Sequence, residues 1–133
     1  MRYFAALLFL FASSQSFSQA LTKKDFKTTL DTFQHPYITA AQLKNAKQLH
    51  TNFPWAHIKS FIVYFGTIGT QDVSQASCDG DSLCPLLINT YFKRLGPGTI
   101  VSFNPIVFNN QGKEVDWNGV TFVIKDSVIK TSP

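Results

Sequence analysis

The segment from Leu83 to Phe108 changes its apolar period halfway along, from the period of a helix to that of a strand. Leu83, Leu87, Tyr91 and Leu95 recur every four residues, and this spacing predicts a helix of about three turns over residues 84–95 with one buried face. Such a helix needs a surface to pack against. The chain therefore requires a second layer, and the residues that follow indicate a sheet.

A glycine-proline-glycine tripeptide separates the two periods. Gly96 occupies the position where a helix commonly ends in a left-handed residue, and Pro97 cannot continue a helix. From Thr99 the side chains are mostly β-branched or aromatic, which predicts a strand. Pro105 interrupts this strand and has no N–H for a ladder bond, so we expect either an edge strand or a bulged one.

Two further strands are predicted. Ile58 to Phe65 is apolar on both faces and should be central in the sheet. After a turn at Asn109–Gly112, Val115 to Lys125 reads as a returning strand, with a bulge or second turn at Asn118–Gly119.

The start of the chain after residue 20 has helical spacing. Phe26, Leu30 and Phe33 lie at i, i+4 and i+7, and Thr22 with Asp25 resembles a capping box. We therefore predict a short amphipathic helix, ended by Pro36. Residues 39–49 are expected to form a helical turn or two.

These elements predict an α+β fold dominated by β-structure: a small antiparallel sheet or sandwich with one packed helix and a short N-terminal helix. The expected organisation is a signal peptide at 1–20, a helix and connection at 21–36, one domain at 37–126 and a flexible tail at 127–133. A chain of 133 residues is one domain by length.

The same segments resemble the C-terminal domain of GldM, a periplasmic component of gliding motility and type IX secretion in the Bacteroidetes. The resemblance rests on a helix ending in Leu-x-x-Gly, an aromatic and aliphatic strand, a polar glycine turn and a closing apolar strand. In this chain these are Phe92–Gly96, Val101–Ile106, Asn109–Gly112 and Val120–Ile124. The resemblance implies a β-rich scaffold that binds a protein partner in the cell envelope.

The first twenty residues read as a secretory signal. A positive start at Arg2 precedes an apolar run from Tyr3 to Ala12, and Ser18-Gln19-Ala20 resembles a cleavage site. We expect cleavage after Ala20, with cleavage after Ser18 as the alternative, and a product in the periplasm or outside the cell. The apolar run is too short to span a bilayer, so no stable membrane insertion is expected.

The two cysteines, Cys78 and Cys84, are expected to form a disulfide in an exported chain. The bond would close a short loop and attach it to the start of the predicted helix. Closing so short a loop contributes about 2 kcal/mol.

Charge and composition argue against nucleic acid as a partner. Without Arg2, eleven of the twelve basic side chains remain against eight acidic ones, and the lysines are scattered. A nucleic-acid-binding domain usually shows a basic stripe instead.

No catalytic or metal-binding motif is present in the sequence. The three histidines, His35, His50 and His57, lack the spacing of zinc ligands, and we predict no metal site and no cofactor. Asp79 and Asp81 have the spacing of calcium ligands, but the loop has no distal Glu. They are better explained as turn and capping residues.

Aromatic side chains and an edge strand are the remaining candidates for function. Trp117, Trp55 and Tyr64 are of the kind that anchors interfaces, and a strand containing Pro105 could accept a partner strand. Trp117 is the strongest candidate for exposure because Asp116 and Asn118 flank it.

Two functional hypotheses follow. The first is an exported, non-enzymatic protein-binding module of the envelope, with a homodimer as a further option. The second is a small hydrolase or small-ligand-binding protein whose site is assembled from distant residues such as Asp79, Asp81 and His57.

Overall fold

The described residues fold into a main sheet, a small second sheet and three short helical segments. The computed structural model describes residues 22–126, so the predicted signal peptide and residues 127–133 lie outside the described residues. The main sheet contains β2 (Tyr37–Thr39), β4 (His57–Thr67), β5 (Val73–Asp79), β6 (Thr99–Phe108), β7 (Glu114–Val115) and β8 (Val120–Lys125), and the small sheet contains β1 (Thr28–Leu30) and β3 (Leu49–Thr51). This confirms the predicted α+β fold dominated by strands.

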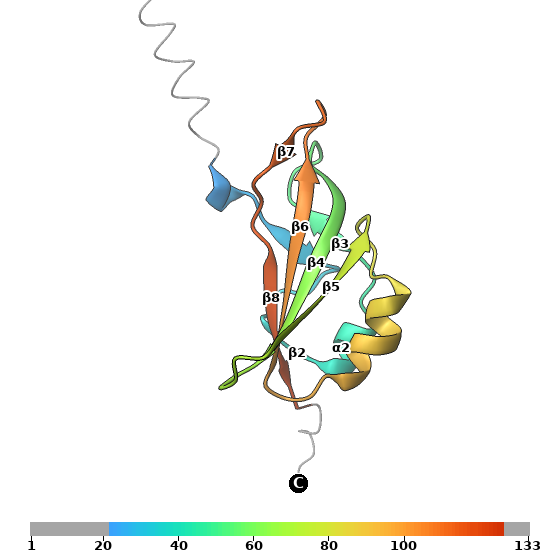
Figure 1. Ribbon diagram of the computed structural model, residues 1–133. Coiled ribbons are helices and arrows are strands. Elements are labelled where there is room, and N and C mark those ends of the chain that lie inside the picture. The colour runs from blue at the N-terminus through green and yellow to red at the C-terminus, as the bar shows by residue number, and fades with distance from the viewer. Residues whose placement is uncertain (1–21, 127–133) are drawn as a thin grey trace, which may run out of the picture.

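The main sheet runs in the order β2-β8-β6-β4-β5, and β7 pairs with β6 (Figure 1). The pairs are antiparallel except β2 with β8, which is parallel. The predicted central strand is confirmed, since β4 lies between β5 and β6. Val73–Asp79 is the return strand of a hairpin from β4.

One face of the main sheet forms the core of the protein. Phe61, Val63, Phe103 and Phe122 alternate with less buried neighbours along their strands and are at most 2% exposed. The alternation follows from the period of two in a strand, and it gives this inner face a row of rings and aliphatic groups.

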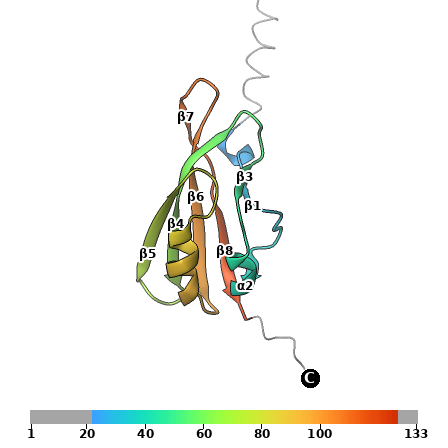
Figure 2. The same cartoon turned by 90° about the vertical axis from the view of Figure 1, so that its right-hand side faces the viewer.

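The helical segments and the small sheet cover this inner face. A π-helical turn, η2 (Leu87–Tyr91), continues into η3 (Phe92–Arg94), and α2 (Ala40–Lys44) lies nearby. Leu87 and Phe92 are fully buried against the sheet, and the Phe92 ring centroid lies 6.2 Å from that of Phe65. In Figure 2, α2, β1 and β3 lie to the right of the sheet, and Leu87 and Phe92 of the helical segment belong to the same buried cluster as Leu43 and Leu49 of these elements. The packed helix predicted near residues 84–95 is therefore confirmed.

The helix ends where the sequence predicts, but the glycine with the left-handed backbone is not the predicted one. Gly98, not Gly96, has the positive φ, of 90°. The chain leaves the helix through Leu95, whose backbone is already extended. The left-handed residue thus belongs to the turn into β6, where the Gly98 N–H donates to Ile124 O at 2.8 Å.

The predicted N-terminal helix over residues 21–34 is wrong beyond its first turn. A single 3-10 turn, η1 (Lys23–Asp25), is present, and the Thr22 N–H donates to Asp25 Oδ2 at 2.8 Å as the capping signal indicated. From Thr28 the chain is β1, because its apolar residues serve two separate clusters. Phe26 packs in an aromatic cluster, whereas Leu30 and Phe33 pack in the main core.

Asp31 explains how β1 ends. Its backbone has a positive φ of 48°, and its carboxylate accepts the N–H groups of Lys47 and Gln48 at 2.9 and 3.0 Å. Asp tolerates this backbone region better than most residues. These bonds hold the turn after β1 against the residues that lead into β3.

The predicted disulfide is present. Cys78 in β5 and Cys84, just before the helical segment, are bonded. On the same edge, the Tyr91 hydroxyl donates to Gln75 O of β5 at 3.3 Å. The disulfide and the helical segment thus cover the outer edge of β5, which would otherwise offer free backbone groups to another strand.

Candidate functional site

The outer face of the main sheet, opposite the buried core, is not covered by another layer of the described elements. Within residues 22–126, the helical segments and the small sheet all lie on the other side (Figures 1 and 2). Strand pairing places the outer side chains in rows across the sheet. We call this surface the open face.

The first row crosses all five strands of the sheet path. It runs from Tyr37 in β2 through Val123, Ile100 and Gly66 to Val73 in β5. Tyr37 and Val73 are 59% and 65% exposed. Apart from the glycine, the whole row is apolar or aromatic and in part open to solvent.

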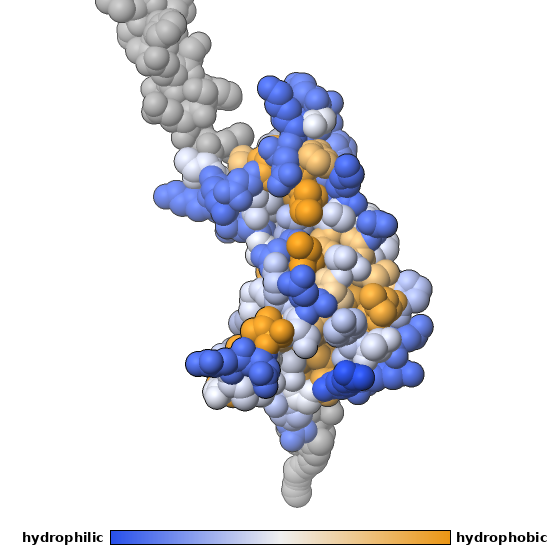
Figure 3. All heavy atoms as spheres, in the orientation of Figure 1, coloured by the Kyte–Doolittle hydropathy of each residue, from blue (hydrophilic) through white to orange (hydrophobic). Residues whose placement is uncertain are grey.

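The next two rows are polar but uncharged. One contains Thr121, Ser102, Tyr64 and Gln75, and the other contains Asn104, Ile62 and Ser77. Within the first of these rows, the Ser102 and Thr121 hydroxyl oxygens lie 2.6 Å apart in a hydrogen bond. Figure 3 shows apolar patches interleaved with paler and blue side chains on the part of this face turned to the viewer.

The absence of charge distinguishes these three rows from an ordinary solvated sheet face. An antiparallel sheet can expose one face to water, but about a quarter to a third of a typical protein surface is charged. In these rows of the described chain every side chain is neutral. Charges begin only at the rims, with Lys125 at one end and Asp79 and Lys59 at the other.

A hollow lies beside Gly66 in the open face. The hollow has a volume of about 270 Å³, and its lining includes Tyr64, Thr70, Val73 and Ile100. A Cβ placed at Gly66 would meet nothing closer than 3.9 Å. There is therefore room at this position for a larger side chain, which would occupy part of the hollow.

Tyr64 is the only predicted partner-binding residue that lies on the open face. It is half-buried and stands between Ser102 and Gln75 in the second row. Its ring also lines the hollow. A partly exposed tyrosine beside an apolar hollow is typical of binding surfaces.

Trp117 does not lie on an exposed surface, so its prediction as the best exposed aromatic is wrong. It is 6% exposed, its ring stacks on Phe26 at 4.5 Å, and its Nε1–H donates to Lys27 O at 3.0 Å. Trp55 is half-buried in the same cluster, 5.6 Å from Trp117. Both tryptophans thus belong mainly to the core.

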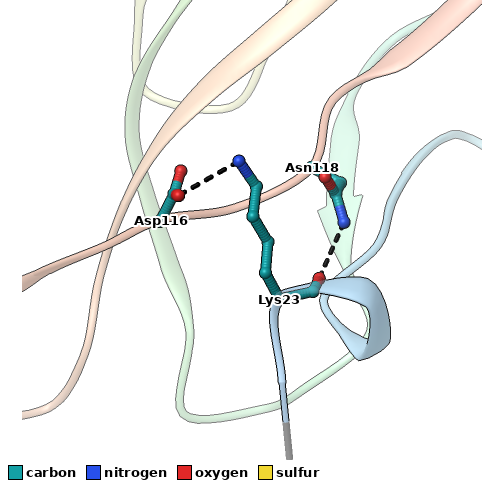
Figure 4. A network of polar contacts seen from close by, with 3 residues as sticks. All are labelled: Lys23, Asp116 and Asn118. Carbon is teal, nitrogen blue, oxygen red and sulfur yellow. Dashed lines mark hydrogen bonds and ion pairs between the residues drawn. The ribbon is translucent and has the colours of Figure 1, made fainter.

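The flanking polar residues that suggested exposure hold the N-terminal segment in place over this cluster. Asp116 pairs with Lys23 at 3.0 Å, and the Asn118 Nδ2 donates to Lys23 O at 2.7 Å (Figure 4). Thr28 Oγ1 donates to Asn118 O at 2.6 Å. Residues 22–28 therefore form a strap that seals Trp117, and no local pattern around residue 117 could reveal a strap so distant in sequence.

Pro105 is not in an edge strand, because β6 lies between β4 and β8. It pairs with Phe61 and therefore points to the inner face. Along β6, pairing with β8 ends at Phe103 and pairing with β7 begins at Val107, so this side of β6 has no described strand partner beside Pro105. The register shift in this strand pair lies in β4, between Ile58 and Ser60, opposite Val107 and Ile106, so the predicted bulge is not in the strand that contains Pro105.

The structure brings together only two of the three residues, Asp79, Asp81 and His57, that the hypothesis of a hydrolase or small-ligand-binding protein would use. His57 and Asp81 line an open hollow of about 550 Å³, together with His50, but Asp79 is not among its lining residues. His57 Nε2 is bonded to Asn110 Oδ1 at 2.8 Å, and Asp81 Oδ2 accepts from Gln48 Nε2 at 2.8 Å. His57 and Asp81 are thus each hydrogen-bonded to an amide side chain of a neighbouring segment.

Two observations concern metals and membranes. Among residues 22–126, no three His, Cys, Asp or Glu side chains gather closely enough to hold a metal ion. Over the same residues, no helix combines the length and the apolar character that crossing a membrane requires.

Comparisons with known proteins leave the family open. No family model matches the chain, and no curated protein and no solved structure is significantly similar to it. The resemblance to the GldM C-terminal domain therefore stays a prediction.

Proposed function

We propose that this chain is an exported, non-enzymatic module that binds a protein partner through its open face. The uncharged rows around Tyr64 and the Gly66 hollow are the observation that carries the proposal. A protein interface excludes water from its centre, and interface centres are depleted of charged residues and enriched in tyrosine and other aromatic residues. The open face has this composition, and its charges lie at the rim.

The location of the module in the cell envelope is part of the same proposal. The Cys78–Cys84 disulfide is typical of an oxidising compartment, and the first twenty residues have the features of a secretory signal. The resemblance to the GldM C-terminal domain suggests an envelope partner. We expect neither a cofactor nor a nucleic-acid partner.

A pull-down from envelope extracts tests this proposal. The exported form of the chain should retain a protein partner, and Tyr64→Lys should reduce recovery roughly tenfold or more, because docking would bury an unpaired charge. Thr29→Lys is the matched control, since Thr29 is exposed in β1 of the small sheet, away from the open face. Its recovery should equal that of the unaltered chain.

Two results would count against the proposal. Recovery of no partner by the unaltered chain would remove its basis. Equal recovery with Tyr64→Lys and with the unaltered chain would show that binding occurs elsewhere on the molecule. Circular dichroism on both variants establishes that each is folded.

A further inference from the structure

We infer that a second copy of this chain docks on the open face and forms a weak symmetric dimer. The inference rests on the proposed function, since it uses the same face and names its occupant. It follows from the distribution of charge, from the position of exposed apolar groups and from the available area.

The absence of charged side chains from the open face favours a second copy of the chain as the partner. In a two-fold symmetric interface, a residue near the axis faces its own copy, so a charged residue there would meet a like charge. The three central rows contain no such residue. The whole chain has a formal net charge of +4, so a contact between two copies must exclude this charge from its centre.

The exposed apolar groups are concentrated at one end of this face. Among residues 22–126, four large apolar side chains are exposed, and two of them, Tyr37 and Val73, lie in the first row. Ile68, 63% exposed, lies in the hairpin next to the row, where its N–H donates to Gly98 O. The fourth, Leu86, is in the helical region instead.

The exposed side chain of Ile68 therefore lies next to the hollow at Gly66. Ile68 is only two residues from Gly66, which lines the hollow of about 270 Å³. In a symmetric pair, each copy can offer Ile68 to the hollow of the other. This self-complementarity is the geometric condition for an isologous contact.

The area of the face predicts that the dimer is weak. Five strands at about 4.8 Å spacing and rows at about 6.8 Å give a patch of roughly 20 by 20 Å. Because side chains make the surface uneven, its accessible area exceeds that of a flat patch. The area buried on both copies together is then roughly 1,000–1,200 Å², which is at the lower end for specific interfaces. We therefore expect a dissociation constant on the order of 10–100 µM rather than a permanent dimer.

Sedimentation equilibrium on the exported form tests this inference. From about 1 to about 500 µM, the average mass should rise from that of one chain towards that of two. Gly66→Val occupies part of the hollow with a residue suited to a strand, and it should weaken the dimer roughly tenfold or more. Ile68→Ser should act in the same direction.

Leu86→Ser is the matched control. Leu86 is 51% exposed and is a comparable apolar side chain, but it lies outside the open face. This variant should leave the dissociation constant unchanged. A Leu86→Ser variant that weakens the dimer as much as Gly66→Val would overturn the assignment of the dimer to the open face.

The failure of this inference is separable from the failure of the proposed function. If the chain is a single copy at every concentration, while the pull-down still yields a Tyr64-dependent partner, the open face binds a different protein and the dimer is refuted. If the chain dimerises but Gly66→Val and Ile68→Ser leave the dimer unchanged, the inference is refuted as well.

Discussion

Replacing Trp117 by Ala should lower the free energy of unfolding by about 3–5 kcal/mol, the usual cost of removing a buried aromatic side chain. The substitution removes the stack on Phe26 and leaves Lys27 O without its donor. It also opens a space beneath the strap that Lys23 and Asp116 help to close. The exposed ion pair adds little to this effect, since exposed pairs are weak.

Urea denaturation followed by circular dichroism measures this effect without depending on tryptophan fluorescence. Trp117→Phe is the matched control, because it keeps a ring against Phe26 while it loses the Nε1–H donor and part of the indole volume. Its cost should be about 1–3 kcal/mol, the cost of a buried acceptor left unsatisfied. If Trp117→Ala costs less than about 1 kcal/mol, the residue is exposed in solution and the packing described here is wrong.

Replacing Gly119 by Ala should destabilise the protein by about 3 kcal/mol, the upper part of the range for overpacking. A Cβ at this position would overlap the backbone carbonyl of Phe103, and it would also lie within 2.9 Å of Asn104 Oδ1. Backbone atoms of β6 cannot move without disturbing the centre of the sheet. The expected result is a lower urea midpoint with an unchanged denaturant slope.

Gly66→Ala is the matched control for Gly119→Ala. A Cβ at Gly66 meets only ordinary contacts, with Asp72 O and a Val73 methyl group. This variant should be neutral or slightly more stable than the unaltered chain, because alanine reduces the entropy of the unfolded chain. Equal effects of the two substitutions would contradict the close approach of residue 119 to β6.

The elements that the sequence predicts best are those with long, regular patterns. The alternation in β4 and β8 and the spacing of Leu87 and Tyr91 each reflect contacts with one continuous surface. The turn at Asn109–Gly112 is also predictable, since Gly112 has a positive φ and the Asn109 side chain accepts two backbone N–H groups. In these places local preference and tertiary packing agree.

The errors arise where distant segments decide the structure. Phe26, Leu30 and Phe33 fit a helix, but pairing of β1 with β3 and packing into two clusters override that local spacing. Trp117 has polar neighbours, yet those neighbours bond to the strap, which lies some ninety positions earlier. Pro105 is tolerated inside the sheet because two partner strands stop on either side of it.

The candidate site was only partly visible for the same reason. Tyr64 was a candidate by residue type, but its association with Ile100, Val73 and Gly66 depends on strand order. Gly66 by itself carries no sequence signal for a binding surface. The signal that could have found the site is the lack of charge at alternate positions of β4 and β6, which becomes meaningful once these strands are known to be neighbours.

Site-specific photo-crosslinking tests most directly the claim that one face of this sheet is built as a core and the other as a docking surface. A benzoyl-phenylalanine at position 64 would be compared with one at position 111, since Gln111 is exposed in the β6–β7 turn. The account predicts a discrete crosslinked product, either with a second copy or with another protein, from position 64 and none above background from position 111. Crosslinking only from position 111, or equally from both positions, would contradict it.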